Sequence, residues 1–363
     1  MNDVAAWHSA TKTYRGNLAA LKIEEKIPLA PLTTFKVGGP ARWYAQADSE
    51  FEVAAAVDHA RKHSLPLFVL GGGSNLLVSD EGWRGLVLHV RLKGITQRGD
   101  LFESAAGEDW DSFVAQVVSK GYSGIECMSG IPGTVGGTPV QNVGAYGQEV
   151  RDSIAAVRAL DLQRGEAVDL TADECRFDYR RSRFNSDEMG RFIVLRVTYR
   201  LEQNGKPKIA YADLQKYFAQ QQVGDPTLQQ VRDAVREIRR SKAMLIEEGD
   251  PDSRSAGSFF KNPQVTPYLF QQVHNKANGK SLPNWPGSNG LVKLSAAWLI
   301  EQAGFHKGYA KGPVGISSKH TLAIVNRGGA KAADVLALKD EIQNRVRSEF
   351  GVELTPEPVM VGF

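Results

Sequence analysis

The chain has little cysteine, no long apolar run and no export signal. Its two cysteines, Cys127 and Cys175, are too few for a disulfide framework and lack the Cys-x-x-Cys spacing of a zinc or redox pair. Nowhere do about eighteen apolar residues run together, which a transmembrane helix requires. The N-terminal stretch lacks the apolar core of a signal peptide. We therefore expect a cytoplasmic protein that does not enter a membrane.

The chain also lacks an excess of one charge. Its 44 Lys and Arg residues against 41 Asp and Glu residues give a net charge of +3, with both signs interspersed. A clustered basic face, which nucleic acids and anionic membranes require, is absent from this pattern. Of the seven histidines, only His59 and His63 have helical ligand spacing, and no acidic third ligand accompanies them. We expect no nucleic-acid partner, no membrane partner and no metal.

The chain alternates helical and strand-like segments. At roughly 150 residues per domain, 363 residues predict two or three domains. Ser49 and Glu52 form a capping-box pattern ahead of an amphipathic segment. The periodicity predicts helices over 50–63, 110–120, from 227 onward, 294–302 and 332–350, strands over 66–70, 86–90, 101–105, 154–162, 192–201, 321–325 and 359–361, and a loop over 275–290. A polar stretch at 202–207 marks a candidate domain boundary.

Glycine-rich loops are the strongest signal for a ligand. Residues 121–147 contain eight glycines in 27 positions, where average composition gives about two. Three loops stand out: Gly71, Gly72, Gly73, Ser74 and Asn75; Gly130 to Gly137, with Ile131, Pro132, Gly133 and Gly136; and Asn142 to Gly147, with Gly144, Ala145 and Tyr146. Such loops can bind anionic oxygen through backbone N–H groups, although surface turns are the commoner reason for glycine clusters. No Gly-x-Gly-x-x-Gly and no P-loop pattern is present, so the residues by themselves indicate an extended phosphorylated cofactor bound by backbone donors.

Three polar side chains in the second half are candidates for chemistry. Arg180 lies in an arginine-rich segment, 175–184, which can clamp an acidic substrate or form a solvated turn. Ser258 has no Gly-x-Ser-x-Gly elbow, so it is either a turn serine or a proton donor to a strongly basic carbanion. Glu357 stands between two prolines, either as a solvated acid near the end of the chain or as an acid/base carboxylate.

Together these motifs resemble the UDP-N-acetylenolpyruvoylglucosamine reductase family, the flavoenzymes of peptidoglycan precursor synthesis. The resemblance runs from about residue 33 to residue 362 and rests on 71–78, 130–137, 141–147, 176–180, 257–263 and the last strand. It implies an α+β fold with a two-lobed FAD-binding region of the vanillyl-alcohol-oxidase type (PCMH) and a smaller α+β substrate-binding domain. It divides the chain into an N-terminal extension (1–28), the FAD-binding region (29–203, with lobes of about 29–94 and 95–203) and the substrate-binding domain (204–363), whose last strand can return to the first lobe.

The resemblance also assigns a reaction. NADPH would reduce noncovalent FAD, which would then reduce UDP-N-acetyl-3-O-(1-carboxyvinyl)glucosamine to UDP-N-acetylmuramate. The glycine loops would line the FAD. Arg180 and Glu357 would stabilise the enolate, and Ser258 would donate the proton. The residues implied for the substrate are Tyr179, Tyr211, Lys242, Asn262 and Trp285, the last at the tip of an aromatic loop that closes over the substrate.

The sequence departs from the family pattern at two positions, and two alternative functions remain open. Pro358 and Val359 follow Glu357 where the family often has Val-Arg, and Trp285 stands where it often has tyrosine. A related flavin oxidoreductase acting on another acidic substrate would keep the glycine loops without needing Ser258, Lys242 and Asn262. A noncatalytic flavin-binding module would not need Arg180, Ser258 or Glu357, all of which are present. We expect small-molecule substrates and a monomer.

Overall fold

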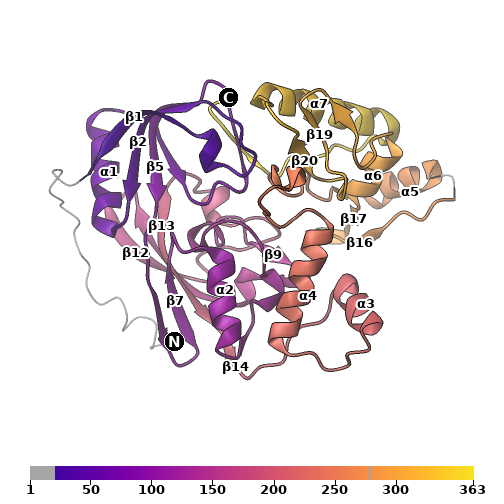
Figure 1. Cartoon of the computed structure of the whole chain (residues 1–363), viewed down its shortest axis with the longest axis horizontal. Coiled ribbons are helices and arrows are strands. Elements are labelled where there is room, and N and C mark those ends of the chain that lie inside the picture. Colours follow the sequence, from indigo (N-terminus) through magenta and orange to yellow (C-terminus); the bar gives the residue numbers. More distant parts are fainter. Residues whose placement is uncertain (1–20, 278) are drawn as a thin grey trace. The chain divides into compact units, whose positions relative to one another are not determined.

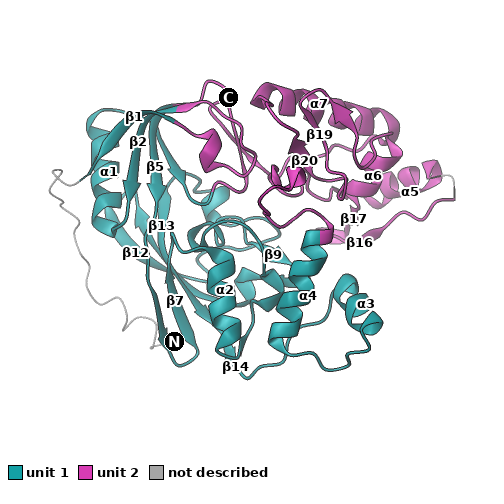
Figure 2. Cartoon of the chain, viewed as in Figure 1, with its two compact units in different colours: residues 1–27, 41–72, 84–240 teal, residues 28–40, 73–83, 241–363 magenta. Residues whose placement is uncertain are grey.

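The computed structural model describes residues 21–277 and 279–363 (Figure 1). By its internal contacts the chain divides into two compact units (Figure 2). Unit 1 comprises the described part of Met1–Ile27 with Ala41–Gly72 and Arg84–Arg240, and unit 2 comprises Pro28–Pro40, Gly73–Trp83 and Ser241–Phe363. Residues 1–20 of the expected N-terminal extension lie outside the described residues.

The first sheet of unit 1 has the strand order β1-β2-β5-β3, and β3 runs parallel to β5. Its strands are β1 (Ile23–Pro28), β2 (Pro40–Ala47), β3 (Leu67–Leu70) and β5 (Trp83–Val90). Helix α1 (Glu50–Lys62) begins with the predicted capping box, in which the Glu52 N–H donates to Ser49 Oγ and the Ser49 N–H donates to the Glu52 carboxylate. Buried apolar residues of α1 share one core cluster with those of β5. The predicted helix over 50–63 is therefore confirmed.

The second sheet of unit 1 is antiparallel, with the order β12-β11-β13-β7-β6. Its strands are β6 (Ile95–Arg98), β7 (Leu101–Ala105), β11 (Ile154–Asp161), β12 (Glu166–Thr171) and β13 (Phe192–Arg200). Helix α2 (Trp110–Ser119) packs its predicted apolar face against this sheet, and the Trp110 and Tyr199 ring centroids lie 5.8 Å apart. The strands predicted over 101–105, 154–162 and 192–201 are confirmed to within a residue.

The remainder of unit 1 consists of short elements and two further helices. These are β8 (Tyr122–Ser123), β9 (Gly144–Ala145), β10 (Gln148–Glu149), β14 (Glu202–Gln203), α3 (Ala212–Gln220) and α4 (Leu228–Ser241). Helix α4 begins at the predicted Thr227 cap, where Thr227 Oγ1 accepts from the Gln230 N–H at 3.2 Å. Two basic residues of this helix, Arg232 and Arg239, are buried.

The described residues of unit 2 form three α-helices and three groups of short strands. The helices are α5 (Pro267–Lys276), α6 (Ala296–Gln302) and α7 (Ala332–Phe350). The strands are β4 (Leu76–Val78), β15 (Gln264–Val265), β16 (Asn284–Pro286), β17 (Val292–Leu294), β18 (Ala310–Lys311), β19 (Val314–Ile316), β20 (Ile324–Asn326) and β21 (Val359–Val361). The prediction of a continuous loop over 275–290 is wrong, because β16 pairs there with β17.

Two early segments of the chain belong to unit 2. Strand β21 pairs in parallel with β4. Asn326 Nδ2 donates to the Phe35 carbonyl oxygen at 3.0 Å, and Asp80 accepts from the first backbone N–H groups of α7, those of Ala332 at 2.8 Å and Ala333 at 3.0 Å. The compact units therefore divide at 240/241, and two early segments belong to unit 2, whereas the composition shift predicted a single division near 203/204.

The Asp80 cap generates a prediction for unit 2. We expect Asp80→Ala to lower the free energy of unfolding by about 1–2 kcal/mol, because two helix N–H groups lose their acceptor and a negative charge leaves the helix N-terminus. Denaturant unfolding followed by circular dichroism measures the change. The exposed neighbour Glu81 provides the control, since Glu81→Ala removes no side-chain cap; equal stability of the two variants would contradict the role of Asp80.

Candidate functional site

The first two glycine loops meet closely within unit 1. A Cβ atom on Gly72 would lie 2.6 Å from Gly133 Cα, and one on Gly71 would lie 2.9 Å from Thr134 Oγ1. On the far side of the second loop, a Cβ on Gly136 would lie 2.6 Å from Ala106 Cβ. The Gly136 N–H donates to the Ala106 carbonyl oxygen at 2.8 Å. These glycines therefore allow backbone to approach backbone where any side chain would separate the loops.

A partly buried ionic cluster fixes the start of the second loop. The Gly130 N–H donates to Asp111 Oδ1 at 2.6 Å, and Arg239 Nε donates to the Gly130 carbonyl oxygen at 3.1 Å. Asp111 also forms ion pairs with Arg232 and Arg236, so one carboxylate joins α2 to α4. Burial alone would raise the pKa of Asp111, but the hydrogen bonds from Arg232 and Gly130 outweigh it and hold the pKa below its usual value.

Arg180 lies against the third glycine loop. Its Nη2 donates to the Gly144 carbonyl oxygen at 2.7 Å, and its Nη1 to the Asn142 carbonyl oxygen at 3.4 Å. The Arg180 backbone is in the left-handed region, with φ of 54°. The guanidinium lies 5.6 Å from the ring centroid of Tyr179. The structure thus brings together Arg180, Tyr179 and the third loop, all of which the sequence had singled out.

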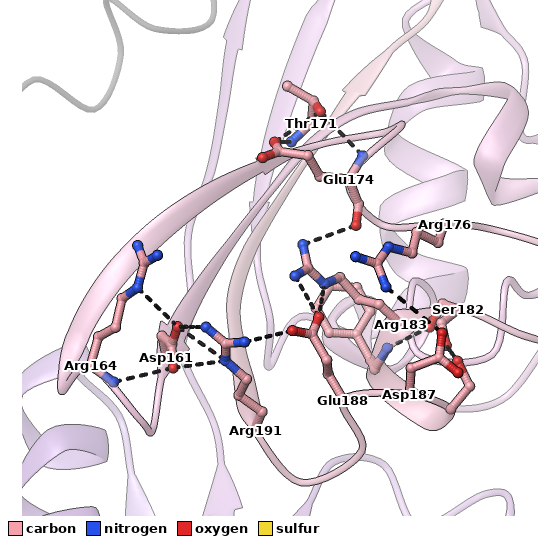
Figure 3. A network of polar contacts seen from close by, with 12 residues as sticks. Asp161, Arg164, Thr171, Glu174, Arg176, Ser182, Arg183, Asp187, Glu188 and Arg191 are labelled. Atoms are coloured by element: carbon pink, nitrogen blue, oxygen red, sulfur yellow. Dashed lines mark hydrogen bonds and ion pairs between the residues drawn. The ribbon is translucent and has the colours of Figure 1, made fainter.

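Of the other three arginines of this segment, Arg183 belongs to a partly buried network of ion pairs and hydrogen bonds (Figure 3). Arg183 Nε donates to Glu188 at 2.5 Å, and its Nη1 donates to the Glu174 carbonyl oxygen at 2.9 Å. Arg191 bridges Glu188 and Asp161, and its Nη2 lies 2.6 Å from Asp161 Oδ2. Arg176 and Arg181, by contrast, form exposed pairs with Asp187. The network therefore holds both ends of the 175–184 segment that carries Arg180.

Two candidate tyrosines share the same unit. The rings of Tyr146 and Tyr211 meet edge to face, with centroids 5.5 Å apart. Burial raises the pKa of Tyr146 to about 12, so its phenol stays protonated at neutral pH and can donate a hydrogen bond. Tyr211 precedes α3 and is 44% exposed. The pair offers one buried donor and one accessible aromatic ring.

In unit 2, backbone hydrogen bonds bring Ser258 and Glu357 onto neighbouring segments. The Glu357 N–H donates to the carbonyl oxygen of Phe259, the residue after Ser258, at 2.9 Å. The Val359 N–H donates to the Asn75 carbonyl oxygen at 2.9 Å, which places the first glycine loop beside the C-terminal strand. Pro358 interrupts no pairing, because bonding resumes at Val359.

His320 also lies at Ser258, and sequence reasoning missed it. Its Nε2 is 3.2 Å from Ser258 Oγ. The two residues are 62 positions apart, and no local pattern links them. The sequence alone assigns no histidine or acidic partner to Ser258, because such a partner can come from any distant segment.

The remaining substrate candidates occupy separate places in unit 2. Lys242 directly follows α4. Asn262 Oδ1 accepts from the Ala296 N–H at 2.9 Å, where α6 begins. Trp285 is 43% exposed and lies on β16, paired with Lys293 of β17, so the expected loop tip is a strand.

Residues 21–277 and 279–363 contain no group of three His, Cys, Asp or Glu side chains placed to hold a metal ion. None of the helices in that part of the chain combines the length and the apolar character that a membrane crossing requires.

The close contact of the glycine loops yields a stability prediction. We expect Gly72→Ala to lower the free energy of unfolding of unit 1 by about 1–3 kcal/mol, because its Cβ would overlap the Gly133 backbone. Gly224→Ala is the matched control, since a Cβ there meets nothing within 4 Å. Thermal unfolding followed by tryptophan fluorescence compares the two, and an unchanged Gly72→Ala transition would contradict the packing.

The Asp161–Arg191 pair yields a pH prediction. The hydrogen bond from Arg191 holds the pKa of Asp161 below its usual value. The folded state therefore binds this proton less readily than the unfolded state does, so the stabilisation is present above the unfolded pKa of about 4 and is lost as the pH falls through the folded pKa. We expect Asp161→Asn to be less stable than the wild type at neutral pH, with a difference that shrinks in acid.

Denaturant unfolding across a pH series measures this difference. Asp187→Asn is the control, because the Asp187 carboxylate is 57% exposed and forms only surface pairs. A pH-independent difference between Asp161→Asn and the wild type would contradict the assignment.

Two family models match this chain, one in its first half and one in its second half. Residues 41–171 match the model of the FAD binding domain, and residues 250–361 match the model of the UDP-N-acetylenolpyruvoylglucosamine reductase C-terminal domain. The α+β fold class with an FAD-binding region is confirmed. The closely packed glycine loops, the buried cation Arg239 and the protonated Tyr146 fit an extended anionic cofactor, so the residues present agree with FAD.

Similarity extends over nearly the whole chain. UDP-N-acetylenolpyruvoylglucosamine reductase of Streptomyces coelicolor is 45% identical over 92% of this chain and 89% of its own length. The reductase of Thermobifida fusca is 45% identical over 93% and 97%. The crystal structure of UDP-N-acetylenolpyruvylglucosamine reductase from Thermus caldophilus superposes with a TM-score of 0.65 at 27% identity, over 94% of this chain and 99% of that one. The chain belongs to the UDP-N-acetylenolpyruvoylglucosamine reductase family.

Proposed function

We propose that this flavoenzyme uses NADPH to reduce UDP-N-acetyl-3-O-(1-carboxyvinyl)glucosamine to UDP-N-acetylmuramate in peptidoglycan precursor synthesis. The family supports the reaction, and the FAD binding domain supports the cofactor. The observation that carries the proposal is the backbone bond from the Glu357 N–H to the Phe259 carbonyl oxygen, which holds the candidate acid Ser258 and the candidate carboxylate Glu357 on adjacent segments. FAD is noncovalent, since residues 71–77 contain no histidine to tether it.

FAD, when bound, supplies the hydride that reduces the enolpyruvyl double bond. Addition of hydride at C3 of that group leaves an electron pair at C2, conjugated with the carboxylate. Ser258 then donates its hydroxyl proton to C2. A hydroxyl is a poor acid, but a carbanion is a strong enough base to take its proton, so a group with a high pKa can serve at this step.

Charge on the substrate carboxylate grows as the enolate forms, and Arg180 is the proposed cation for it. Two of its N–H groups already donate to carbonyl oxygens of the third glycine loop, which orients the guanidinium before substrate binds. Glu357 assists in stabilising the enolate. Because the Arg180 guanidinium is oriented before the substrate binds, it need not reorganise during the reaction.

The rest of the substrate is assigned to residues that the sequence singled out. Tyr179, Tyr211, Lys242 and Asn262 bind the UDP-sugar, with Lys242 supplying positive charge for the pyrophosphate. Trp285 offers an exposed indole on β16 that can stack on the ligand. The flavin ligands proposed are Gly71, Gly72, Gly73, Ser74, Asn75, Ile131, Pro132, Gly133, Gly136, Gly137, Gly144, Ala145 and Tyr146.

We propose a cytoplasmic monomer that acts on small molecules and binds neither nucleic acid nor membrane. The balanced charge of +3 supports the absence of an anionic macromolecular partner. The domains proposed for these roles are an N-terminal extension (1–28), an FAD-binding region (29–203) and a substrate-binding domain (204–363).

An anaerobic absorption experiment tests the function as a whole. The flavin bands of the purified protein should bleach on addition of NADPH and return on addition of the enolpyruvyl UDP-sugar. Bleaching without return would retain the cofactor and donor but overturn the substrate. A protein that takes up no FAD would overturn the flavoenzyme proposal itself.

The role of Ser258 predicts a separation of the two half-reactions. We expect Ser258→Ala to slow flavin reoxidation by the sugar by several powers of ten, while reduction by NADPH stays within about threefold of the wild type, as loss of a transition-state interaction requires. Stopped-flow absorbance measures both rates. Ser348→Ala, at an exposed position of α7, is the control; equal slowing of both half-reactions by Ser258→Ala would contradict its role as the acid.

A further inference from the structure

We propose that His320 is a positioning residue for Ser258: its Nε2–H donates a hydrogen bond to Ser258 Oγ, leaving the hydroxyl proton directed at the substrate. This inference rests on the proposed function, which makes Ser258 the acid. Its starting observation is the contact between His320 Nε2 and Ser258 Oγ at 3.2 Å within unit 2. Ser258 and His320 are both partly exposed, so solvent can reach the pair.

The direction of the hydrogen bond follows from the chemistry of a serine that acts as an acid. A hydroxyl group has one proton and two lone pairs. If Ser258 gave its proton to His320 in the resting state, the proton would point away from the carbanion. His320 must therefore be the donor and Ser258 Oγ the acceptor, so that the single hydroxyl proton stays available for C2.

The same hydrogen bond assists the transfer. When the Ser258 O–H bond breaks and the C2–H bond forms, the negative charge of the carbanion passes to Ser258 Oγ. An N–H group already directed at that oxygen stabilises the developing alkoxide, in the manner of an oxyanion-hole donor. Solvent then restores the serine proton.

The turn that carries His320 is held by a buried carboxylate. Asp252, which is 7% exposed, accepts from Ser317 Oγ at 3.1 Å, from the Ser318 N–H at 3.0 Å and from Ser318 Oγ at 2.6 Å. Ser317 Oγ in turn accepts from the backbone N–H groups of Lys319 at 3.0 Å and His320 at 3.2 Å. The backbone of His320 is thus fixed before any ligand binds.

The Ser258 side of the contact is fixed independently. The N–H of Phe259 donates to the Leu322 carbonyl oxygen at 2.8 Å, which ties the residue after Ser258 to the segment just after His320. A contact held from both sides by separate hydrogen bonds is pre-organised, and a pre-organised donor is the kind that a positioning role requires.

Three variants of His320 test the proposal, because they differ in whether they place an N–H donor where Nε2 lies. The amide nitrogen of glutamine reaches about as far along the side chain as Nε2, whereas that of asparagine reaches only as far as Nδ1. We expect His320→Ala and His320→Asn to slow flavin reoxidation by the sugar by about 10²-fold, the effect of losing one such donor. His320→Gln should restore the rate to within about fivefold of the wild type.

Two further readouts separate positioning from a general structural effect. In all three variants, flavin reduction by NADPH and the dissociation constant of the sugar, measured by perturbation of the oxidised flavin spectrum, should stay near wild-type values. In a Ser258→Ala background, His320→Ala should have no further effect, because its action passes through the serine. His306→Gln, at an exposed histidine of the same unit, is the control.

A spectroscopic measurement tests the contact without turnover. In ¹⁵N-edited NMR of the oxidised holoenzyme, His320 Nε2 should carry the proton, and its resonance, assigned by its absence in His320→Gln, should shift in Ser258→Ala. Failure of Gln to rescue, wild-type rates in His320→Asn, equal loss of both half-reactions, or additive effects of the two alanine variants would each overturn the inference. If the wild-type flavin is not reoxidised by the sugar at all, the proposed function fails, and an unshifted Nε2 resonance is then the result that overturns the contact.

Discussion

Two backbone hydrogen bonds of Phe259 connect the segments of unit 2 that carry Ser258, His320 and Glu357. The Phe259 N–H bonds to the segment after His320, and the Phe259 carbonyl oxygen bonds to Glu357. One residue therefore joins two segments that lie 63 and 98 positions further along the chain, at Leu322 and Glu357. Phe259 is fully buried in the core of the unit, so both hydrogen bonds are shielded from competing water. The contact between Ser258 and His320 and the pairing with Glu357 lie next to these two hydrogen bonds.

Unit 1 uses a different device for the same purpose. There, charged side chains form hydrogen bonds with the backbone of the second and third glycine loops, beside the apolar packing of loop residues such as Val135 and Val143. Asp111 accepts from the Gly130 N–H and pairs with two arginines of α4, while Arg239 bonds to the Gly130 carbonyl oxygen. Arg180 likewise secures the third loop by donating to its carbonyl oxygens. Burial of these charges is costly unless each is paired, and the pairing fixes the loops in one conformation.

The division of the chain into two units also follows from hydrogen bonds and apolar contacts. Residues 73–83 contain part of the first glycine loop, strand β4 and Asp80. Strand β4 pairs with β21, and the Asp80 carboxylate accepts from the N-terminus of α7, so both partners lie late in the sequence. Residues 28–40 add Phe35, whose ring meets that of Phe259 with centroids 6.2 Å apart. These segments gain their hydrogen bonds and apolar contacts in unit 2, although in sequence they interrupt the strands of unit 1.

The sequence alone determined the features that depend on near neighbours. These are the capping box of α1, the apolar faces of α1 and α2, the long strands, and the glycine loops, which do not match the P-loop pattern. It also nominated Arg180, Ser258 and Glu357, whose residue types suit the chemistry. It could not foresee His320 beside Ser258, Arg232 and Arg239 turned inward, or Trp285 on a strand. The placements of His320, Arg232 and Arg239 required tertiary structure, because each depends on a partner distant in sequence, and local periodicity carries no information about which distant segment a residue will meet. Trp285 pairs with the near neighbour Lys293, in a hairpin that the composition of the segment did not reveal.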